Sequence, residues 1–124
     1  MALTRTCRIL LAEDEPQLLR FYKIFLEDEE YEVVTARDGQ ECLDEYLRQQ
    51  KDSFNLVILD HRMPRKNGME AAKEIAALNP LQKLLMITAY SGVLDLSDRP
   101  ANLKIIPKPF EVKDFISTIE VLIK

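Results

Sequence analysis

The chain has 124 residues, a length that suits one domain with a single well-filled core. Hydrophobic residues make up 47% and charged residues 31% of it, as in an ordinary globular domain. The net charge of −4 argues against a nucleic-acid-binding surface, which needs a basic stripe. No apolar run reaches the length of a membrane span, and the first six residues lack the pattern of a secretory signal. We therefore expect one domain over residues 1–124 in the cytoplasm, with Cys7 and Cys42 as buried, reduced thiols.

The apolar pattern predicts strands that alternate with helices along the chain. Strands are expected at residues 7–12, 31–36, 54–59, 83–88 and 103–106. Helices are expected from Pro16, from about residue 40 to 50, over about residues 69–78 and over residues 112–123. The side chains expected to face the core include Phe21, Tyr22 and Phe25 of the first helix, Leu47 of the second and Leu78 of the third. Residues 91–100 leave room for one or two helical turns only, because Gly92 lies near one end of this segment and Pro100 at the other.

Strands that alternate with helices in this way predict a parallel sheet with helices on both faces. At this length, the natural arrangement is a flavodoxin-like, doubly wound α/β fold of five strands in the order 2-1-3-4-5. The helix between the fourth and fifth strands is expected to be shortened or irregular.

Asp60 follows a run of four aliphatic residues, 56–59, that is typical of a strand buried on both faces. Pro64 then stops any continuation of the strand or of a helix. A carboxylate at the carboxyl end of a buried strand lies where open parallel sheets place their chemistry. The alternative is that Asp60 merely ends the strand or caps a turn.

In the expected strand order, the ends of strands 1, 3, 4 and 5 bring five polar side chains to one crevice: Glu13, Asp14, Asp60, Thr88 and Lys108. Three converging carboxylates repel one another unless one keeps a proton or a cation binds. Oxygen ligands from acids suit Mg²⁺, and an ammonium and a hydroxyl beside them are donors for a phosphoryl group. A carboxylate nucleophile with a metal beside it is the arrangement that forms an aspartyl phosphate. The acids after the first strand have a second interpretation, as charges that favour a helix N-terminus.

With these motifs the sequence resembles the receiver domain of bacterial two-component response regulators. The resemblance covers nearly the whole chain, and its motifs are Glu13-Asp14, Asp60-His61-Arg62-Met63-Pro64 with Gly68, Thr88-Ala89 and Lys108-Pro109. The resemblance implies a signalling switch and not an enzyme. Such a switch catalyses only its own phosphorylation and dephosphorylation. The phosphoryl group would come from a histidine kinase or a phosphotransfer protein, and the phosphorylated form would act on an unknown downstream protein.

By the same likeness, Asp60 is the phosphoacceptor. Glu13 and Asp14 would bind Mg²⁺, directly or through water, together with Asp60 and the backbone carbonyl of Arg62. Lys108 would pair with Asp60 or with its phosphoryl group, and the Lys108-Pro109 peptide bond would be cis. Thr88 would turn its hydroxyl toward the phosphoryl oxygen.

Two further positions follow from the resemblance. Arg62 and Tyr90 correspond to the residues that flank the path of the attacking water, and their large side chains are expected to slow hydrolysis of the aspartyl phosphate. The sequence departs from the family at Ile105, where the family usually has an aromatic residue that couples to the threonine.

His61, adjacent to Asp60, is expected to face solvent in a loop, because neighbours at a strand end point in opposite directions.

Three other functions compete with this one. A receiver-like scaffold that binds partners without phosphorylation fits the departures at Ile105 and in residues 91–100. An aspartyl-phosphate phosphatase of the haloacid-dehalogenase type needs a second aspartate at the position of Arg62. A flavodoxin needs a phosphate-binding loop after the first strand, where this chain has three acids that would repel the phosphate of FMN.

Overall fold

The computed structural model describes residues 7–49, 53–89 and 98–124. The elements in chain order are β1 (Arg8–Ala12), α1 (Pro16–Asp28), β2 (Glu32–Ala36), α2 (Gly39–Arg48), β3 (Leu56–Asp60), α3 (Gly68–Leu78), β4 (Leu84–Thr88), β5 (Leu103–Pro107) and α4 (Val112–Ile123). Every predicted strand is confirmed, as are the four helices predicted outside residues 91–100. Most of that irregular segment, with the shortened helix expected there, lies outside the described residues.

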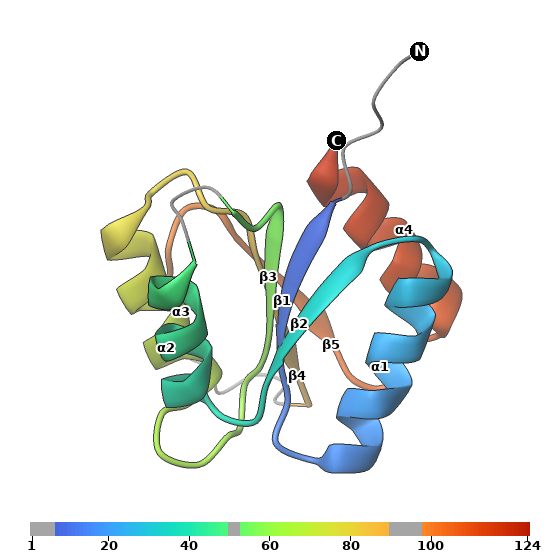
Figure 1. Cartoon of the computed structure of the whole chain (residues 1–124), viewed down its shortest axis with the longest axis horizontal. Helices are drawn as coiled ribbons and strands as arrows, with labels where there is room; N and C mark the ends of the chain where they lie inside the picture. The colour runs from blue at the N-terminus through green and yellow to red at the C-terminus, as the bar shows by residue number, and fades with distance from the viewer. Residues whose placement is uncertain (1–6, 50–52, 90–97) are drawn as a thin grey trace.

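The five strands form one parallel sheet in the order β2-β1-β3-β4-β5, as predicted. Figure 1 shows α2 and α3 on one face of this sheet and α1 and α4 on the other. The fold is therefore the doubly wound α/β fold that the alternation of strands and helices indicated. Over the described residues, none of the helices has both the length and the apolar character that crossing a membrane requires.

Alternate residues of the central strands supply two separate cores. Leu10, Val57 and Leu84 pack with the helices α2 and α3, whereas Ile9, Ile58 and Leu85 pack with α1 and α4. Successive side chains of a strand point to opposite faces, so a strand covered on both faces must be apolar at every position. This explains why β3 and β4 are buried along their whole length.

Some side chains that were predicted to be in the core are exposed. The exposed fraction is 47% for Phe21, 58% for Leu47 and 53% for Leu78, whereas Tyr22 is buried. Phe21 instead packs edge-to-face on Phe25, with 4.6 Å between ring centroids. Helical periodicity predicts the direction of a side chain around the helix axis, but not how far the neighbouring elements extend to cover it.

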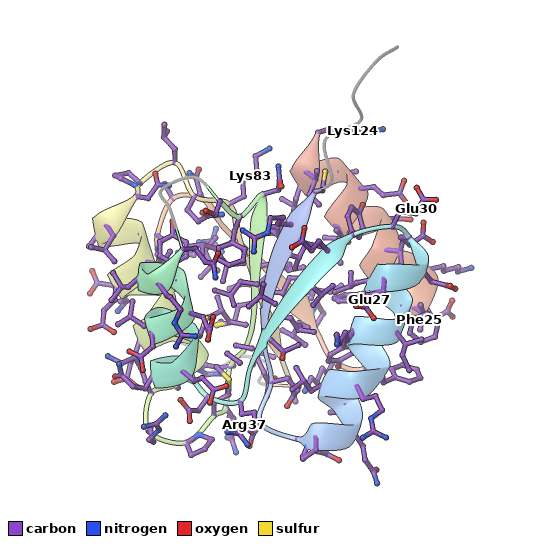
Figure 2. The ribbon with its side chains drawn as sticks, viewed as in Figure 1. Phe25, Glu27, Glu30, Arg37, Lys83 and Lys124 are labelled. Atoms are coloured by element: carbon purple, nitrogen blue, oxygen red, sulfur yellow. The ribbon has the colours of Figure 1, made fainter. Side chains whose placement is uncertain are left out.

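The two ends of the strands lie at opposite edges of the sheet. Figure 2 labels Lys83, just before β4, at the upper edge and Arg37, just after β2, at the lower edge. At the upper edge the ammonium of Lys83 donates a hydrogen bond to the backbone carbonyl of Lys124 at 3.2 Å. The lower edge, where the strands end, carries the predicted functional residues.

Candidate functional site

The backbone on both sides of Asp60 is tightly held. Asp60 is the last residue of β3 and pairs with Ile87 of β4. His61 donates its backbone N–H to the Ile87 carbonyl at 2.9 Å and accepts the N–H of Gly68 at 2.8 Å. A Cβ at Gly68 would lie 2.3 Å from the Asp60 carbonyl oxygen, so the loop after β3 can fold back this closely only at a glycine. The backbone position of Asp60 is therefore fixed by strand pairing and by this close approach.

The structure brings the three predicted acids together. Carboxylate oxygens of Glu13, Asp14 and Asp60 all lie within 4.8 Å of one another. Glu13 and Asp60 are buried, with exposed fractions of 1% and 7%, and Asp14 is exposed. One oxygen of Glu13, Oε2, accepts the backbone N–H of Glu15 at 3.1 Å. The other, Oε1, is buried without a hydrogen-bond partner among the described residues.

Lys108 supplies positive charge to this cluster. Its Nζ lies 3.1 Å from Oδ1 of Asp60 and 3.9 Å from Oε1 of Glu13. The backbone N–H of Lys108 donates to the Thr88 carbonyl at 2.8 Å, which ties the end of β5 to the end of β4. The expected cis peptide bond between Lys108 and Pro109 is confirmed.

Aromatic packing anchors the chain that follows Lys108. The ring of Phe110 stacks on Phe115 of α4, with 5.1 Å between centroids, and on Tyr22 of α1, with 6.1 Å. Stacked aromatic rings at such distances add stability beyond the area they bury. The loop that carries Lys108 is thus attached to both helices on this face of the sheet.

Burial and charge shift the pKa values of the clustered groups. Burial, opposed by the Glu15 N–H and reinforced by the charge of Asp60, raises the pKa of Glu13 to about 7. Burial also raises the pKa of Asp60, although the hydrogen bond and charge of Lys108 oppose it. Burial alone would lower the pKa of Lys108, but the hydrogen bond and charge of Asp60 raise it. Two buried acids and the exposed Asp14 therefore share a single ammonium group, that of Lys108.

The donor set fits a small divalent cation. Carboxylate oxygens are the ligands that Mg²⁺ prefers in proteins, and they converge here from two strand ends. A buried carboxylate oxygen without a hydrogen-bond partner, Oε1 of Glu13, is an acceptor that a cation would satisfy. The residues present therefore fit a bound Mg²⁺ ion.

Thr88 and His61 form a contact that sequence reasoning missed. The Thr88 side chain, only 3% exposed, places Oγ1 3.2 Å from Nδ1 of His61. His61 lies in the loop after β3, as predicted, but it is half-buried against Thr88, so the prediction that it faces solvent is wrong. Burial lowers the pKa of His61, against the opposing charge of Asp60. The prediction failed because it considered β3 alone, whereas the partner of His61 lies on the neighbouring strand, β4.

A second missed feature connects the loop after Asp60 to the start of α2. Asp38 caps α2 by accepting the backbone N–H of Glu41 at 2.8 Å, and it also accepts two hydrogen bonds from Arg65, at 3.0 and 3.2 Å. The backbone N–H of Gly39 donates to the Lys66 carbonyl at 3.0 Å. Nothing in the sequence around Asp38 and Gly39 pointed to a contact with the loop at residues 65–66.

Three predicted positions remain, Arg62, Tyr90 and Ile105. The side chain of Arg62 is exposed, and Tyr90 lies outside the described residues. Ile105 is half-buried and packs against the core shared with α2 and α3.

Comparisons with known proteins agree with this fold and cluster. The family described as "Response regulator receiver domain" matches residues 9–120. The response regulator receiver protein CpdR of Brucella abortus is 35% identical over 115 residues, which cover 91% of this chain and 93% of CpdR. The transcriptional regulatory protein PdtaR of Mycobacterium tuberculosis is 36% identical, over 94% of this chain but only 56% of PdtaR.

A solved structure is similar over the same range. The crystal structure of the response regulator TrrA from Thermotoga maritima, in complex with Mg²⁺-BeF, has a TM-score of 0.83 and 34% sequence identity, and the match covers 94% of this chain and 99% of TrrA. The order of the strands, the cluster of acids at their carboxyl ends and these matches over nearly the full length have one explanation. This chain belongs to the response regulator receiver domain family of two-component signalling.

Proposed function

We propose that this receiver domain takes up one phosphoryl group on the carboxylate of Asp60, with Mg²⁺ bound beside it. The observation that carries the proposal is the convergence of Glu13, Asp14 and Asp60, with the ammonium of Lys108 3.1 Å from Asp60. Asp60 is buried at a strand end and held in place by its backbone, as a nucleophile must be.

The residues divide the chemistry among them. An oxygen of Asp60 forms a bond to phosphorus while the bond from phosphorus to the donor's leaving group breaks, and the leaving group departs with the electron pair. Lys108 balances charge on Asp60 before the transfer and on the phosphoryl oxygens after it. The hydroxyl of Thr88 donates a hydrogen bond to a phosphoryl oxygen of the product.

Glu13, Asp14, Asp60 and the backbone carbonyl of Arg62 are the groups we assign to Mg²⁺. When bound, Mg²⁺ supplies positive charge that offsets the repulsion between the acids and the incoming phosphoryl group. The TrrA structure, which is a complex with Mg²⁺ and BeF, supports this assignment through a relative of 34% identity.

The partners follow from the family. A histidine kinase or a phosphotransfer protein supplies the phosphoryl group, and a downstream protein of unknown identity reads the phosphorylated form. Arg62 and Tyr90 complete the proposal as residues that slow hydrolysis by crowding the path of water.

The test is phosphorylation by acetyl phosphate, with detection by intact mass. With Mg²⁺, the protein should gain one phosphoryl group, and it should gain none when EDTA replaces the cation. Asp60→Asn should abolish the gain, whereas Asp114→Asn, an exposed acid at the start of α4, should leave it unchanged. Uptake by the Asp60→Asn protein would refute the assignment of the phosphoacceptor. Absence of uptake by the folded parent would favour the scaffold that binds partners without phosphorylation.

A further inference from the structure

The tip of the loop between β3 and α3, residues 65–66, is attached to the start of α2. The backbone N–H of Gly39 donates to the Lys66 carbonyl at 3.0 Å, and a Cβ at Gly39 would lie 2.0 Å from that oxygen. The guanidinium of Arg65 donates two hydrogen bonds to the Asp38 carboxylate, from Nε at 3.0 Å and from Nη2 at 3.2 Å. Asp38 is itself held in place, because it is 8% exposed and accepts the backbone N–H of Glu41 as the cap of α2. Backbone and side chain therefore both attach the tip to α2.

The backbone at the tip has a conformation that needs such support. The φ angle of Arg65 is 66°, in the left-handed region that residues with a side chain seldom adopt. The N–H of Lys66 donates to the Pro64 carbonyl at 2.7 Å, so Arg65 is the central residue of a three-residue turn. Turns of this kind with a positive φ are rare and strained. Backbone strain persists only where surrounding contacts hold it, and Asp38 and Gly39 supply such contacts here.

The conformation of this loop matters because the loop carries a group assigned to the metal. The carbonyl of Arg62 belongs to the peptide that follows Asp60 by two residues and precedes the strained turn at Arg65. Mg²⁺ requires a near-ideal octahedral arrangement of its ligands, so a carbonyl ligand must be presented in one direction. A turn that relaxed at Arg65 would rotate the peptide groups before it, and the Arg62 carbonyl with them.

We propose that Arg65 is a positioning residue, whose paired hydrogen bonds to Asp38 hold the loop in the conformation that presents the Arg62 carbonyl to Mg²⁺. The proposal rests on the function proposed above and goes beyond it, because it assigns a role to two residues outside the metal and phosphoryl site. Losing a direct partner of a metal ligand costs about 10–100-fold in affinity. Arg65 acts through the backbone and its side chain is 59% exposed, so we expect a smaller loss, of about fivefold.

The experiment measures the Kd of Mg²⁺ alone, from the backbone amide chemical shifts during a titration with MgCl₂. Arg65→Lys keeps the charge but cannot form the paired hydrogen bonds, and it should bind Mg²⁺ about fivefold more weakly than the parent. Arg65→Met should bind about as weakly, although the loss of a positive charge near a cation would by itself strengthen binding. Arg37→Met is the matched control, since Arg37 is an exposed arginine beside Asp38 that pairs with Glu41 instead, and its affinity should stay within twofold of the parent.

Asp38→Ser separates positioning from charge. Serine still caps a helix but cannot accept the paired hydrogen bonds of Arg65, so this variant should also bind Mg²⁺ about fivefold more weakly. In the double variant with Arg65→Met the two changes of charge cancel, so a purely electrostatic effect would restore the affinity of the parent. Positioning by the pair predicts instead the same loss as in either single variant, because the contact can be removed only once.

A second measurement tests the attachment without metal. The backbone N–H of Gly39 donates to the tip of the loop, whereas that of Gly68 donates at its base, to the His61 carbonyl. In Arg65→Lys, hydrogen exchange should be about fivefold faster at the Gly39 N–H and should change by less than twofold at the Gly68 N–H.

The possible outcomes separate this inference from the proposed function. A Kd within twofold of the parent in Arg65→Lys or in the double variant would overturn the positioning role and leave the proposed function intact. Unchanged exchange at the Gly39 N–H would overturn it as well, because Arg65 would then not hold the tip. If the folded parent did not bind Mg²⁺, the proposed function would fail and the positioning role with it.

Discussion

Replacing Glu13 by glutamine should make the metal-free protein more stable at pH 8, although it alters the proposed metal site. Burial raises the pKa of Glu13 from its ordinary value of 4.5 to about 7. The folded protein therefore keeps this proton to a higher pH than the unfolded chain does. As the pH rises from about 4.5 to about 7, the unfolded chain loses the proton first, so the free energy of unfolding falls. Glu13→Gln removes this decline, because glutamine does not titrate.

The size of the effect follows from the two pKa values. At about 1.4 kcal/mol per pKa unit, the full cost of ionising Glu13 in the fold is about 3 kcal/mol. Most of this cost appears between pH 5 and pH 8, where the free energy of unfolding should fall by at most about 2.5 kcal/mol because of the proton that Glu13 loses. The stability of Glu13→Gln relative to the parent should therefore be greater at pH 8 than at pH 5, by about 1 to 2.5 kcal/mol, since local relaxation reduces the cost.

The assay is urea unfolding followed by circular dichroism, at both pH values and with EDTA. Glu15→Gln is the matched control, since Glu15 is an exposed acid two residues away whose backbone N–H still donates to residue 13. The difference in free energy of unfolding between Glu15→Gln and the parent should be nearly the same at pH 5 and at pH 8. The reasoning is refuted if Glu13→Gln also shows the same difference at pH 5 and pH 8.

The same samples test the metal site. At a Mg²⁺ concentration one hundred times the Kd, binding to the folded state alone should stabilise the parent by about 2.7 kcal/mol. Glu13→Gln, with one carboxylate fewer, should gain clearly less from the same concentration. An equal gain would mean that Glu13 does not contribute to the binding of the cation.

Four other substitutions have defined outcomes. Lys108→Met removes the ammonium 3.1 Å from Asp60, so the pKa of Asp60 should rise further. The rate of phosphorylation by acetyl phosphate should then fall more at pH 6 than at pH 8. An equal fall in rate at the two pH values would contradict this. Gly68→Ala should destabilise the fold by more than about 1 kcal/mol in urea unfolding, because its Cβ would lie 2.3 Å from the Asp60 carbonyl oxygen, and unchanged stability would show that the loop yields easily. Ile75→Ala should lower the free energy of unfolding by about 2–5 kcal/mol, since this side chain of α3 is fully buried. Leu78→Ala on the same helix should lower it by less than about 1 kcal/mol, because Leu78 is exposed. Similar losses of stability in the two variants would contradict this reasoning.

The pattern of the sequence was sufficient for the fold and for the members of the acidic cluster. Strands such as β3 and β4 are buried on both faces, so they must be apolar at every position, and this makes them visible in the sequence. Once the strands are parallel, their carboxyl ends share one edge, and the acids at residues 13, 14 and 60 have to meet there.

Side-chain exposure depended on tertiary packing. Phe21, Leu47 and Leu78 fit the helical period, but the period gives only a direction, and the area that covers a side chain belongs to other elements. The same holds for Arg65, whose partner Asp38 lies 27 residues away in sequence.

The sequence by itself determined which groups stand at the ends of the strands, because hydrophobic periodicity and the topology of a parallel sheet follow from local pattern. Only the tertiary structure decided how those groups are paired and charged. The contact of His61 with Thr88 depends on the register of β3 against β4, and the raised pKa of Glu13 depends on its burial beside Asp60. Both are properties of distances between strands, which no single stretch of sequence contains.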